Sequence, residues 1–273
     1  MKFNTLFIKA VVITAAFAFS YQSVASNSEV IGEYANGCIK GTIQLTDGAH
    51  YQVQKWGYGR NFGHPQLINY IQTLVQKAKA NNLPDLLIGD LSKQYGGSFG
   101  SASSHGSHQS GLDVDISFDF ATPRKTSYEL SHPKDVYLVD THNRITSNFD
   151  KRRVALIYLA ANDSRVERIF VAPGIKKTLC NVYEGHDRSW LQKLRPWFGH
   201  RGHMHVRLGC PIDSPLCVRQ AKSPAGDGCG AELDSWLNPP PPSKSTNKAK
   251  PKPKPKKVLP EQCKALFKQV ASK

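Results

Sequence analysis

The sequence lacks several features that would place it in common classes of protein. It contains no C-x-x-C, so its cysteines do not have the spacing of a zinc knuckle or a redox motif. It contains no H-E-x-x-H, the helix-borne motif of many zinc proteases, and no G-x-G-x-x-G, the phosphate-binding fingerprint of dinucleotide-binding domains. After the first residues, no apolar run is long enough to span a membrane.

Acidic residues are also few, with 21 Asp+Glu against 36 Lys+Arg and a formal net charge of +15. Most of this excess lies in two places. Residues 239–273 hold ten lysines and one acid, a contribution of +9, and Lys2 and Lys9 add two more. Residues 27–238 therefore keep only +4. Since the folded part is only mildly basic, we expect no nucleic acid as partner.

Composition divides the chain into three parts. Residues 1–26 have a lysine near the start, an apolar run from Ala10 to Phe19 and small residues before the expected cleavage point, which predicts a signal peptide. Residues 27–238 have the composition of a folded domain. Residues 239–273 begin with four prolines and contain KAKPKPKPKK, which is typical of an extended polyproline II linker. We therefore expect a secreted protein without a membrane span in its mature chain.

Six cysteines follow the signal, and an even number in a secreted chain favours disulfides. The predicted pairs are Cys210–Cys217, Cys38–Cys263 and Cys180–Cys229. The first closes a short local loop. The second would explain a cysteine beyond a linker by tying the tail back to the domain, and the third is what remains. The last two pairs are hypotheses, because other connectivities use the same cysteines.

Hydrophobic periodicity predicts both helices and short strands. The predicted helices run from Pro65 to Asn81 and over 154–161, and the predicted strands are 85–90, 112–120, 168–172 and 203–208. Strict alternation in 112–120 favours a half-buried strand, and 203–208 alternates in the same way. This mixture favours an α+β fold with a central, mostly antiparallel sheet, flanking helices and long loops, stapled by disulfides.

Five of the ten histidines lie in two short stretches, each at the edge of a predicted strand. In SHGSHQSGLDVD (104–115), His108 lies on a Gly/Ser-rich loop and Asp115 on the polar face of the strand. In HRGHMH (200–205), His203 and His205 point the same way, since residues two apart share a face of a strand. If the two strands are neighbours, His108, Asp115 and His205 converge.

Two imidazoles and one carboxylate are the ligands of a catalytic zinc site, whose fourth position stays open for water. Zinc lowers the pKa of that water to about 7 and polarises a carbonyl, which suits amide hydrolysis. Each cluster alone also fits a plainer interpretation, because single histidines are mostly solvated or structural. Asp113 and Asp115 can equally be outward-facing residues of a half-buried strand. The presence of both clusters in one secreted chain favours the metal site.

The same residues carry a resemblance to known peptidases. His108-x₆-Asp115 followed by His203-x-His205 looks like the zinc peptidases that include lysostaphin-type endopeptidases and D-Ala-D-Ala metallopeptidases. Longer strings resemble the penicillin-insensitive murein endopeptidase family over most of residues 30–238, and the cysteines and the tail fit too. These strings are NFGHP (61–65), LIGD (87–90), SHQSGLDVDI (107–116), RRVALIYLAA (152–161), RPWFGHRGHMHVRL (195–208) and GDGCGAELDSW (226–236).

The resemblance implies a periplasmic zinc endopeptidase of cell-wall remodelling that cuts the D-alanyl-meso-diaminopimelyl cross-link of peptidoglycan. It implies that residues 27–238 form the peptidase domain. The implied zinc ligands are His108, Asp115 and His205, with His105 as a further candidate ligand. The family's three disulfides fit the pairs predicted above.

The resemblance also implies roles for the remaining histidines. His203 is the implied catalytic histidine, which stabilises the oxyanion or relays a proton, and His200 assists as a second polarising or basic residue. Some family members are described with a second metal held by an Asp and a His between the main motifs. Here only Asp140 and His142 are available, and their spacing does not match convincingly.

Other functions remain as alternatives. A zinc carboxypeptidase acting on D-Ala termini uses the same chemistry, and a non-catalytic wall-binding protein would use the basic tail. A homodimer is a further hypothesis that the sequence does not test. Finally, Arg195, Arg201 and Arg207 surround the H-x-H motif, so one of them is expected to engage a stem-peptide carboxylate, unless all three are ordinary surface charges.

Overall fold

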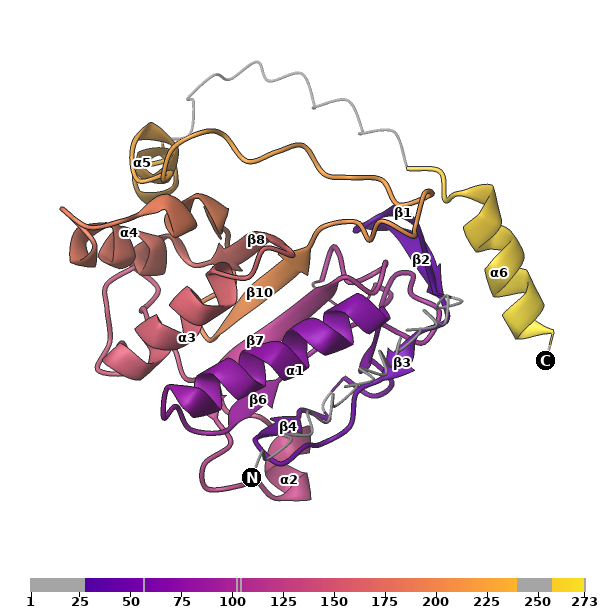
Figure 1. The fold of residues 1–273 in the computed structure, drawn as a ribbon, viewed down its shortest axis with the longest axis horizontal. Helices are drawn as coiled ribbons and strands as arrows, with labels where there is room; N and C mark the ends of the chain where they lie inside the picture. The colour runs from indigo at the N-terminus through magenta and orange to yellow at the C-terminus, as the bar shows by residue number, and fades with distance from the viewer. Residues whose placement is uncertain (1–27, 56, 102, 104, 240–256, 273) are drawn as a thin grey trace, which may run out of the picture.

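The structure, a computed structural model, describes residues 28–239 except 56, 102 and 104, and residues 257–272 (Figure 1). The predicted signal peptide at 1–26 and most of the Pro/Lys-rich tail therefore lie outside the described residues. Within the described part, no helix is both long and apolar enough to cross a membrane. The described chain has an α+β fold, as predicted.

Strands and helices alternate irregularly along the chain. The strands are β1 (Glu29–Glu33), β2 (Asn36–Lys40), β3 (Ile43–Gln44), β4 (Tyr51–Val53), β5 (Phe62–Gly63), β6 (Leu86–Ile88), β7 (Asp113–Phe120), β8 (Val166–Val171), β9 (Leu194–Pro196) and β10 (His203–Leu208). The helices are α1 (Pro65–Ala80), α2 (Ser127–Ser131), α3 (Lys151–Ala161), α4 (Pro173–Val182), the 3₁₀ helix η1 (Ser189–Lys193), α5 (Ala231–Leu237) and α6 (Glu261–Ala271). Both predicted helices and all four predicted strands are confirmed.

A six-stranded sheet in the order β4-β6-β7-β10-β8-β9 forms the centre of the fold. Its inner pairs β6–β7, β7–β10 and β10–β8 are antiparallel, and only the outer pairs β4–β6 and β8–β9 are parallel. The prediction of a mostly antiparallel sheet is therefore confirmed. The strands β7 and β10 lie side by side in the middle of the sheet, which meets the condition under which the two histidine stretches converge.

One face of the sheet packs against helices. Val114, Ile116 and Phe118 of β7 join apolar residues of α1 and α3 in the main hydrophobic core, and Figure 1 shows both helices lying across the same side of the sheet. Because side chains alternate along a strand, Asp113 and Asp115 point to the opposite face. That face holds the polar groups described below.

The prediction that β7 is half buried is wrong, because nearly all of its residues are buried on both faces. Asp113 is fully buried and Asp115 is only 5% exposed. The loop before β7 covers the polar face, since the fully buried His108 of this loop lies against Asp115. Alternation predicts which face is polar, but it does not reveal that a loop folds over it.

All three predicted disulfides are confirmed: Cys38–Cys263, Cys180–Cys229 and Cys210–Cys217. The first joins β2 to α6, the amphipathic end of the tail, which lies beside the β1–β2 hairpin (Figure 1).

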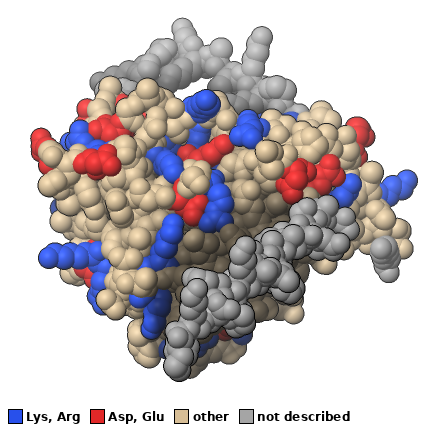
Figure 2. Space-filling view, in the orientation of Figure 1, with Lys and Arg blue, Asp and Glu red and all other residues tan. Residues whose placement is uncertain are grey.

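Basic residues are not gathered on the face drawn in Figure 2, where acidic residues lie among them.

Candidate metal centre and catalytic cleft

A cleft of about 860 Å³ opens on the polar face of the sheet. Side chains from β7, β8, β10 and the loops around them line it. Among the lining residues are Asp115, His105, His200, His203 and His205, so five of the six predicted site residues share one cavity. The sixth, His108, is fully buried and lies behind Asp115.

The register of the sheet brings the two histidine stretches together. In the antiparallel pair β7–β10, His205 lies opposite Asp115 and His203 lies opposite Ser117. Residues directly opposite on neighbouring strands have their side chains in contact range on one face. The distance between His205 Nδ1 and Asp115 Oδ1 is accordingly 3.5 Å.

His108 reaches the same carboxylate from the loop before β7. Its backbone has a positive φ of 66°, which is uncommon for a residue other than glycine and is held here by the surrounding contacts. Its Nδ1 lies 2.7 Å from the carbonyl of Leu91, which can only accept, so Nδ1 carries the proton. Its other nitrogen, Nε2, faces Asp115 Oδ1 at 3.4 Å.

His108 Nε2 and Asp115 Oδ1 are both buried, and neither has a hydrogen-bond partner among the described residues. Leaving two polar atoms without partners in a protein interior is costly. A cation between them satisfies both, since an imidazole lone pair and a carboxylate oxygen are common ligands of zinc. The residues present therefore fit a metal ion.

Asp113 holds the third predicted ligand in place. His205 Nε2 lies 2.9 Å from Asp113 Oδ1 and donates to it, which leaves Nδ1 free to face Asp115. Arg207 Nε donates to the same Asp113 oxygen at 2.7 Å, and the backbone N–H of His108 donates to the other at 3.0 Å. A metal-binding histidine whose second nitrogen is bound to a carboxylate is the usual arrangement around zinc.

His105 approaches Asp115 from the mouth of the cleft. Its Nδ1 lies 3.8 Å from Asp115 Oδ2, and its Nε2 lies 3.5 Å from Asp90 Oδ2. Ligand atoms of His105, His108 and Asp115 all lie within 4.8 Å of one another. The carboxylate of Asp115 is thus shared by two sets of imidazoles, one with His105 and His108 and one with His108 and His205.

His203 and His200 lie beside this centre. His203 Nε2 is 3.9 Å from Asp115 Oδ1, and its side chain is 28% exposed to the cleft. The ring of His200 lies 5.1 Å from that of His203 and 5.9 Å from that of His205. His200 Nδ1 lies 2.6 Å from the carbonyl of Phe198 and donates to it.

Burial controls the protonation of these groups. It lowers the pKa of His105 to about 4 and, together with His203 and His205, the pKa of His200 to about 3, so both rings are neutral. Burial would raise the pKa of Asp115, but His108 and His203 hold it well below its usual range. Burial would lower the pKa of His108, but Asp115, Asp113 and Asp90 raise it to about 9. Neutral rings and an ionised carboxylate are the forms that bind a metal, so a metal ion that binds His108 has to displace a proton.

The two residues considered for a second metal serve another purpose. Asp140 accepts hydrogen bonds from the side chain of Arg144 and from the backbone N–H groups of His142 and Arg144. These bonds lower the pKa of Asp140 to about 2. Its carboxylate closes a surface turn, and among the described residues His142 joins no cluster of metal-binding groups.

Three groups of this site could not be assigned from the sequence. Asp113 was considered only as an ordinary outward-facing residue of the strand, whereas in the structure it contacts and orients His205. Asp90 lines the cleft beside His105, and burial together with Asp115 raises its pKa to about 6. The Leu91 carbonyl fixes the His108 ring. Asp90 is the last residue of the LIGD string, shortly before the histidine loop in the sequence. This position was the only sequence signal that could have assigned Asp90 to the site.

Buried carboxylates and imidazoles that converge beside an open cleft are a group of side chains that could hold a metal ion, as in metallohydrolases. The model of the penicillin-insensitive murein endopeptidase family matches residues 30–268. The chain belongs to this peptidase family, and the resemblance inferred from its sequence is confirmed. The match continues past residue 238 into α6.

Curated relatives agree with the family match. The chain is 49% identical over 219 residues to a penicillin-insensitive murein endopeptidase of Yersinia enterocolitica, covering 79% of this chain and 78% of that protein. It is 48% identical over 221 residues to one from Yersinia pestis, covering 80% and 79%. It is 46% identical over 222 residues to one from Escherichia coli K12, covering 80% of each.

Proposed function

We propose that this protein is a zinc-dependent murein endopeptidase of the periplasm, which hydrolyses the D-alanyl-meso-diaminopimelyl cross-link of peptidoglycan in cell-wall remodelling. The names of its relatives support murein as the substrate. The observation that supports the metal is a facing pair of buried atoms, His108 Nε2 and Asp115 Oδ1, which lie 3.4 Å apart and have no hydrogen bond among the described residues.

In this proposal the zinc ligands are His108 through Nε2, Asp115 through its carboxylate and His205 through Nδ1. Three protein ligands leave one position for water, which separates a catalytic zinc site from a closed structural one. When bound, zinc supplies a nucleophile near neutral pH and polarises the carbonyl that is attacked. Asp113 and the Leu91 carbonyl fix the two rings, so that both present a lone pair to the site.

His203 is proposed as the catalytic histidine. It lies two residues from His205 on the same face of β10, and it is the more exposed of the two to the cleft. From there it can stabilise the oxyanion by donating a hydrogen bond, or pass a proton to the leaving amine. His200 is kept neutral by burial and can polarise His203 or act as a base beside it.

The remaining predictions belong to this proposal. They are a cleaved signal peptide at 1–26, a peptidase domain at 27–238 and a tail at 239–273 that the Cys38–Cys263 disulfide ties back. His105 is proposed as an accessory ligand. The homodimer hypothesis finds no support in the single described chain, and a second metal at Asp140 and His142 is not proposed.

One digestion tests the proposal. Zinc-loaded protein is incubated with cross-linked peptidoglycan, beside a chelator-treated sample and the variants His205→Ala, His203→Ala and His186→Ala. His186 is exposed and lies away from the cleft lining, so its variant controls for the loss of a histidine. We expect dimeric muropeptides to fall to monomers with the wild type and His186→Ala only.

Other outcomes have distinct meanings. Activity that survives both chelation and His205→Ala contradicts the zinc mechanism. Release of terminal D-Ala from monomers without loss of dimers identifies the carboxypeptidase alternative. Binding to the wall without any cleavage identifies the non-catalytic alternative.

A further inference from the structure

The structure separates the arginines near the cleft by the partners they already have. Arg195 pairs with Glu232, and Arg207 pairs with Asp113. Arg201 stacks on the ring of Tyr137 at 4.1 Å and does not line the cleft. None of the three arginines that the sequence singled out therefore offers a free guanidinium to a ligand in the cleft.

Arg168 is different, and no motif in the sequence singles it out. It lies on β8 directly opposite Arg207 of β10, and two residues from Phe170, which lies opposite His205. Residues two apart share a face of a strand, so Arg168 belongs to the face that carries His205. It lines the cleft together with Asp115 and the histidines.

The guanidinium of Arg168 has no carboxylate within ion-pair distance among the described residues. Its one hydrogen bond there goes from Nη2 to the backbone carbonyl of Ala221. Burial, followed by the nearby Arg195 and Arg207, lowers the pKa of Arg168, and Glu167 offsets this only in part. A half-buried guanidinium in a ligand cleft without a counter-ion is a natural receptor for a carboxylate.

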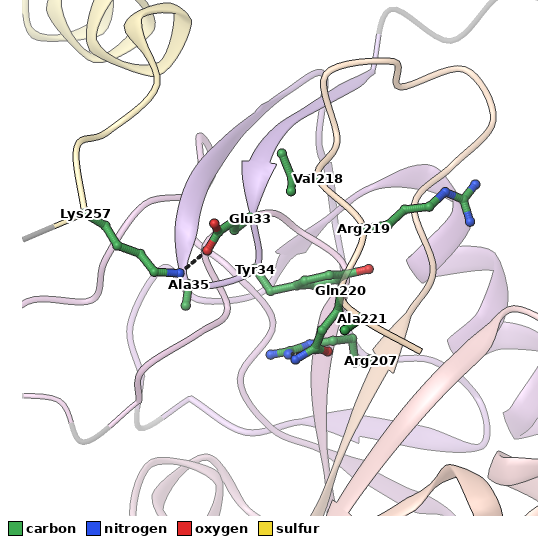
Figure 3. Close-up of a pocket in the computed structure, with 9 residues that line it drawn as sticks. All are labelled: Glu33, Tyr34, Ala35, Arg207, Val218, Arg219, Gln220, Ala221 and Lys257. Carbon is green, nitrogen blue, oxygen red and sulfur yellow. Dashed lines mark hydrogen bonds and ion pairs between the residues drawn. The ribbon is translucent and has the colours of Figure 1, made fainter. Parts of the chain in front are cut away.

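A second, smaller cavity of about 330 Å³ continues from the cleft at this point, since the two share Ala35, Arg207 and Gln220. Figure 3 shows its lining, with Lys257 joined to Glu33 on one side and Arg219 on the other. Ala221, whose carbonyl binds Arg168, also lines this cavity. Arg168 therefore lies where the cleft meets the smaller cavity.

We infer that Arg168 binds a carboxylate of the stem peptide and thereby selects cross-links whose residues next to the cut bond carry a free carboxylate. This inference rests on the proposed function and adds a specificity-determining residue to it. The planar guanidinium can donate two parallel hydrogen bonds to a carboxylate, which a lysine cannot.

The spacing along the sheet agrees with this assignment. Arg207, opposite Arg168, is two residues from His205, a separation of about 6.5–7 Å along the strand. An extended peptide spans about 3.3–3.6 Å per residue. A carboxylate within about two residues of the cut bond therefore reaches Arg168 while the bond lies at the metal centre. Such a carboxylate can belong to the acyl-donor stem or to the amine-donor stem.

The experiment measures KM and kcat on three soluble dimeric muropeptides: one with free carboxylates, one amidated next to the cut bond on the acyl-donor stem, and one amidated on the amine-donor stem. The zinc-loaded enzymes are the wild type, Arg168→Gln, Arg168→Lys and the control Arg152→Gln. Arg152 is an exposed arginine of α3 that does not line the cleft.

On the free dimer we expect Arg168→Gln to lose about tenfold to a hundredfold in kcat/KM, mainly through KM, and Arg168→Lys to lose less. Amidation of the recognised stem should lower kcat/KM of the wild type by a similar factor. It should lower kcat/KM of Arg168→Gln hardly any further. On that dimer the effects of amidation and of the Arg168→Gln substitution do not add, so it identifies which stem Arg168 binds. Arg152→Gln should match the wild type on all three.

The inference is overturned if Arg168→Gln cuts the free dimer as well as the wild type does. It is also overturned if the Arg168→Gln loss is the same on all three dimers, which means a structural role. A wild type that cuts none of the dimers contradicts the proposed function instead, so the two failures are distinguishable.

Discussion

Asp113 Oδ1 lies 2.9 Å from His205 Nε2, and this contact fixes which nitrogen of His205 faces Asp115. The other oxygen of Asp113 accepts from the backbone N–H of His108. One fully buried carboxylate thus positions two of the three proposed ligands, on a strand and on a loop. Arg207 neutralises it with a hydrogen bond to Asp113 Oδ1.

Replacing Asp113 by asparagine should therefore weaken metal binding without removing a ligand. We expect Asp113→Asn to lower zinc affinity by about 10- to 100-fold, since removing a carboxylate that orients a metal-binding histidine has effects of this size. Competition with a chromophoric chelator measures the affinity. Far-UV circular dichroism verifies that the variant is folded.

Asp119→Asn is the matched control, because Asp119 lies on the same strand but pairs with Lys125 at a half-exposed site. Its zinc affinity should equal that of the wild type. If Asp113→Asn folds and binds zinc as tightly as Asp119→Asn does, Asp113 has no role in positioning His205.

The accessory position of His105 gives a second prediction. Because its ring also contacts Asp90, we expect it to support the site and not to complete it. His105→Ala should retain close to one zinc per chain after dialysis, whereas His205→Ala should retain far less. Metal content is measured by atomic emission. If both variants lose the same amount of zinc, His105 contributes as much to metal binding as His205 does.

Local periodicity was enough to predict the elements that carry the site. Alternation placed His203 and His205 on one face of a strand, and helical spacing located α1. The order of strands in the sheet was not accessible in the same way, because β6, β7, β10 and β8 are separated by long stretches of chain. From the sequence alone, the pairing of β7 with β10 could be given only as the condition under which the site forms, and not as a prediction.

The groups that were missed act through contacts with no local signature. Asp113 and Asp115 follow the same alternation, and only the fold shows that one contacts His205 Nε2 and the other contacts Nδ1. Arg168 stood out neither by motif nor by spacing. It stands out in the structure because its neighbours Arg195 and Arg207 have carboxylate partners.

The disulfide that ties α6 to β2 gives a third prediction. Cys263 and Leu266 pack with Ile31 and Cys38, and Phe267 packs over Gly97, where a side chain would clash with its ring. Gly97 begins the loop that leads to the histidines. The double variant Cys38→Ser/Cys263→Ser should lose about 2–5 kcal/mol of unfolding free energy and some zinc affinity.

The double variant Cys210→Ser/Cys217→Ser is the comparison, because its cysteines are only 7 residues apart, against 225 for Cys38 and Cys263. A shorter loop restricts the unfolded chain less, so its loss of stability should be smaller.

Deletion of residues 239–256 with Cys263 kept should leave activity on soluble muropeptides unchanged. Loss of activity there would mean that the deleted segment shapes the site.

Lys176 gives a prediction about pH that is independent of the metal. Its ammonium is fully buried and donates to the backbone carbonyls of Leu191, Leu194 and Asp227. Burial lowers the pKa of Lys176 from 10.5 to about 8. Between these two values the unfolded chain binds a proton that the folded protein has released, so this lysine makes the free energy of unfolding rise with pH.

Lys176→Met removes this titration and leaves three buried carbonyls without their donor. We expect it to lose about 2–4 kcal/mol near pH 7, and the gap to the wild type to widen between pH 8 and 10.5. Lys177→Met, at the exposed neighbouring position of α4, should show neither effect. Urea unfolding at several pH values measures both. A constant gap above pH 8 would show that Lys176 titrates alike in the folded and unfolded chains, and a narrowing gap would show that folding raises its pKa; either result contradicts the prediction.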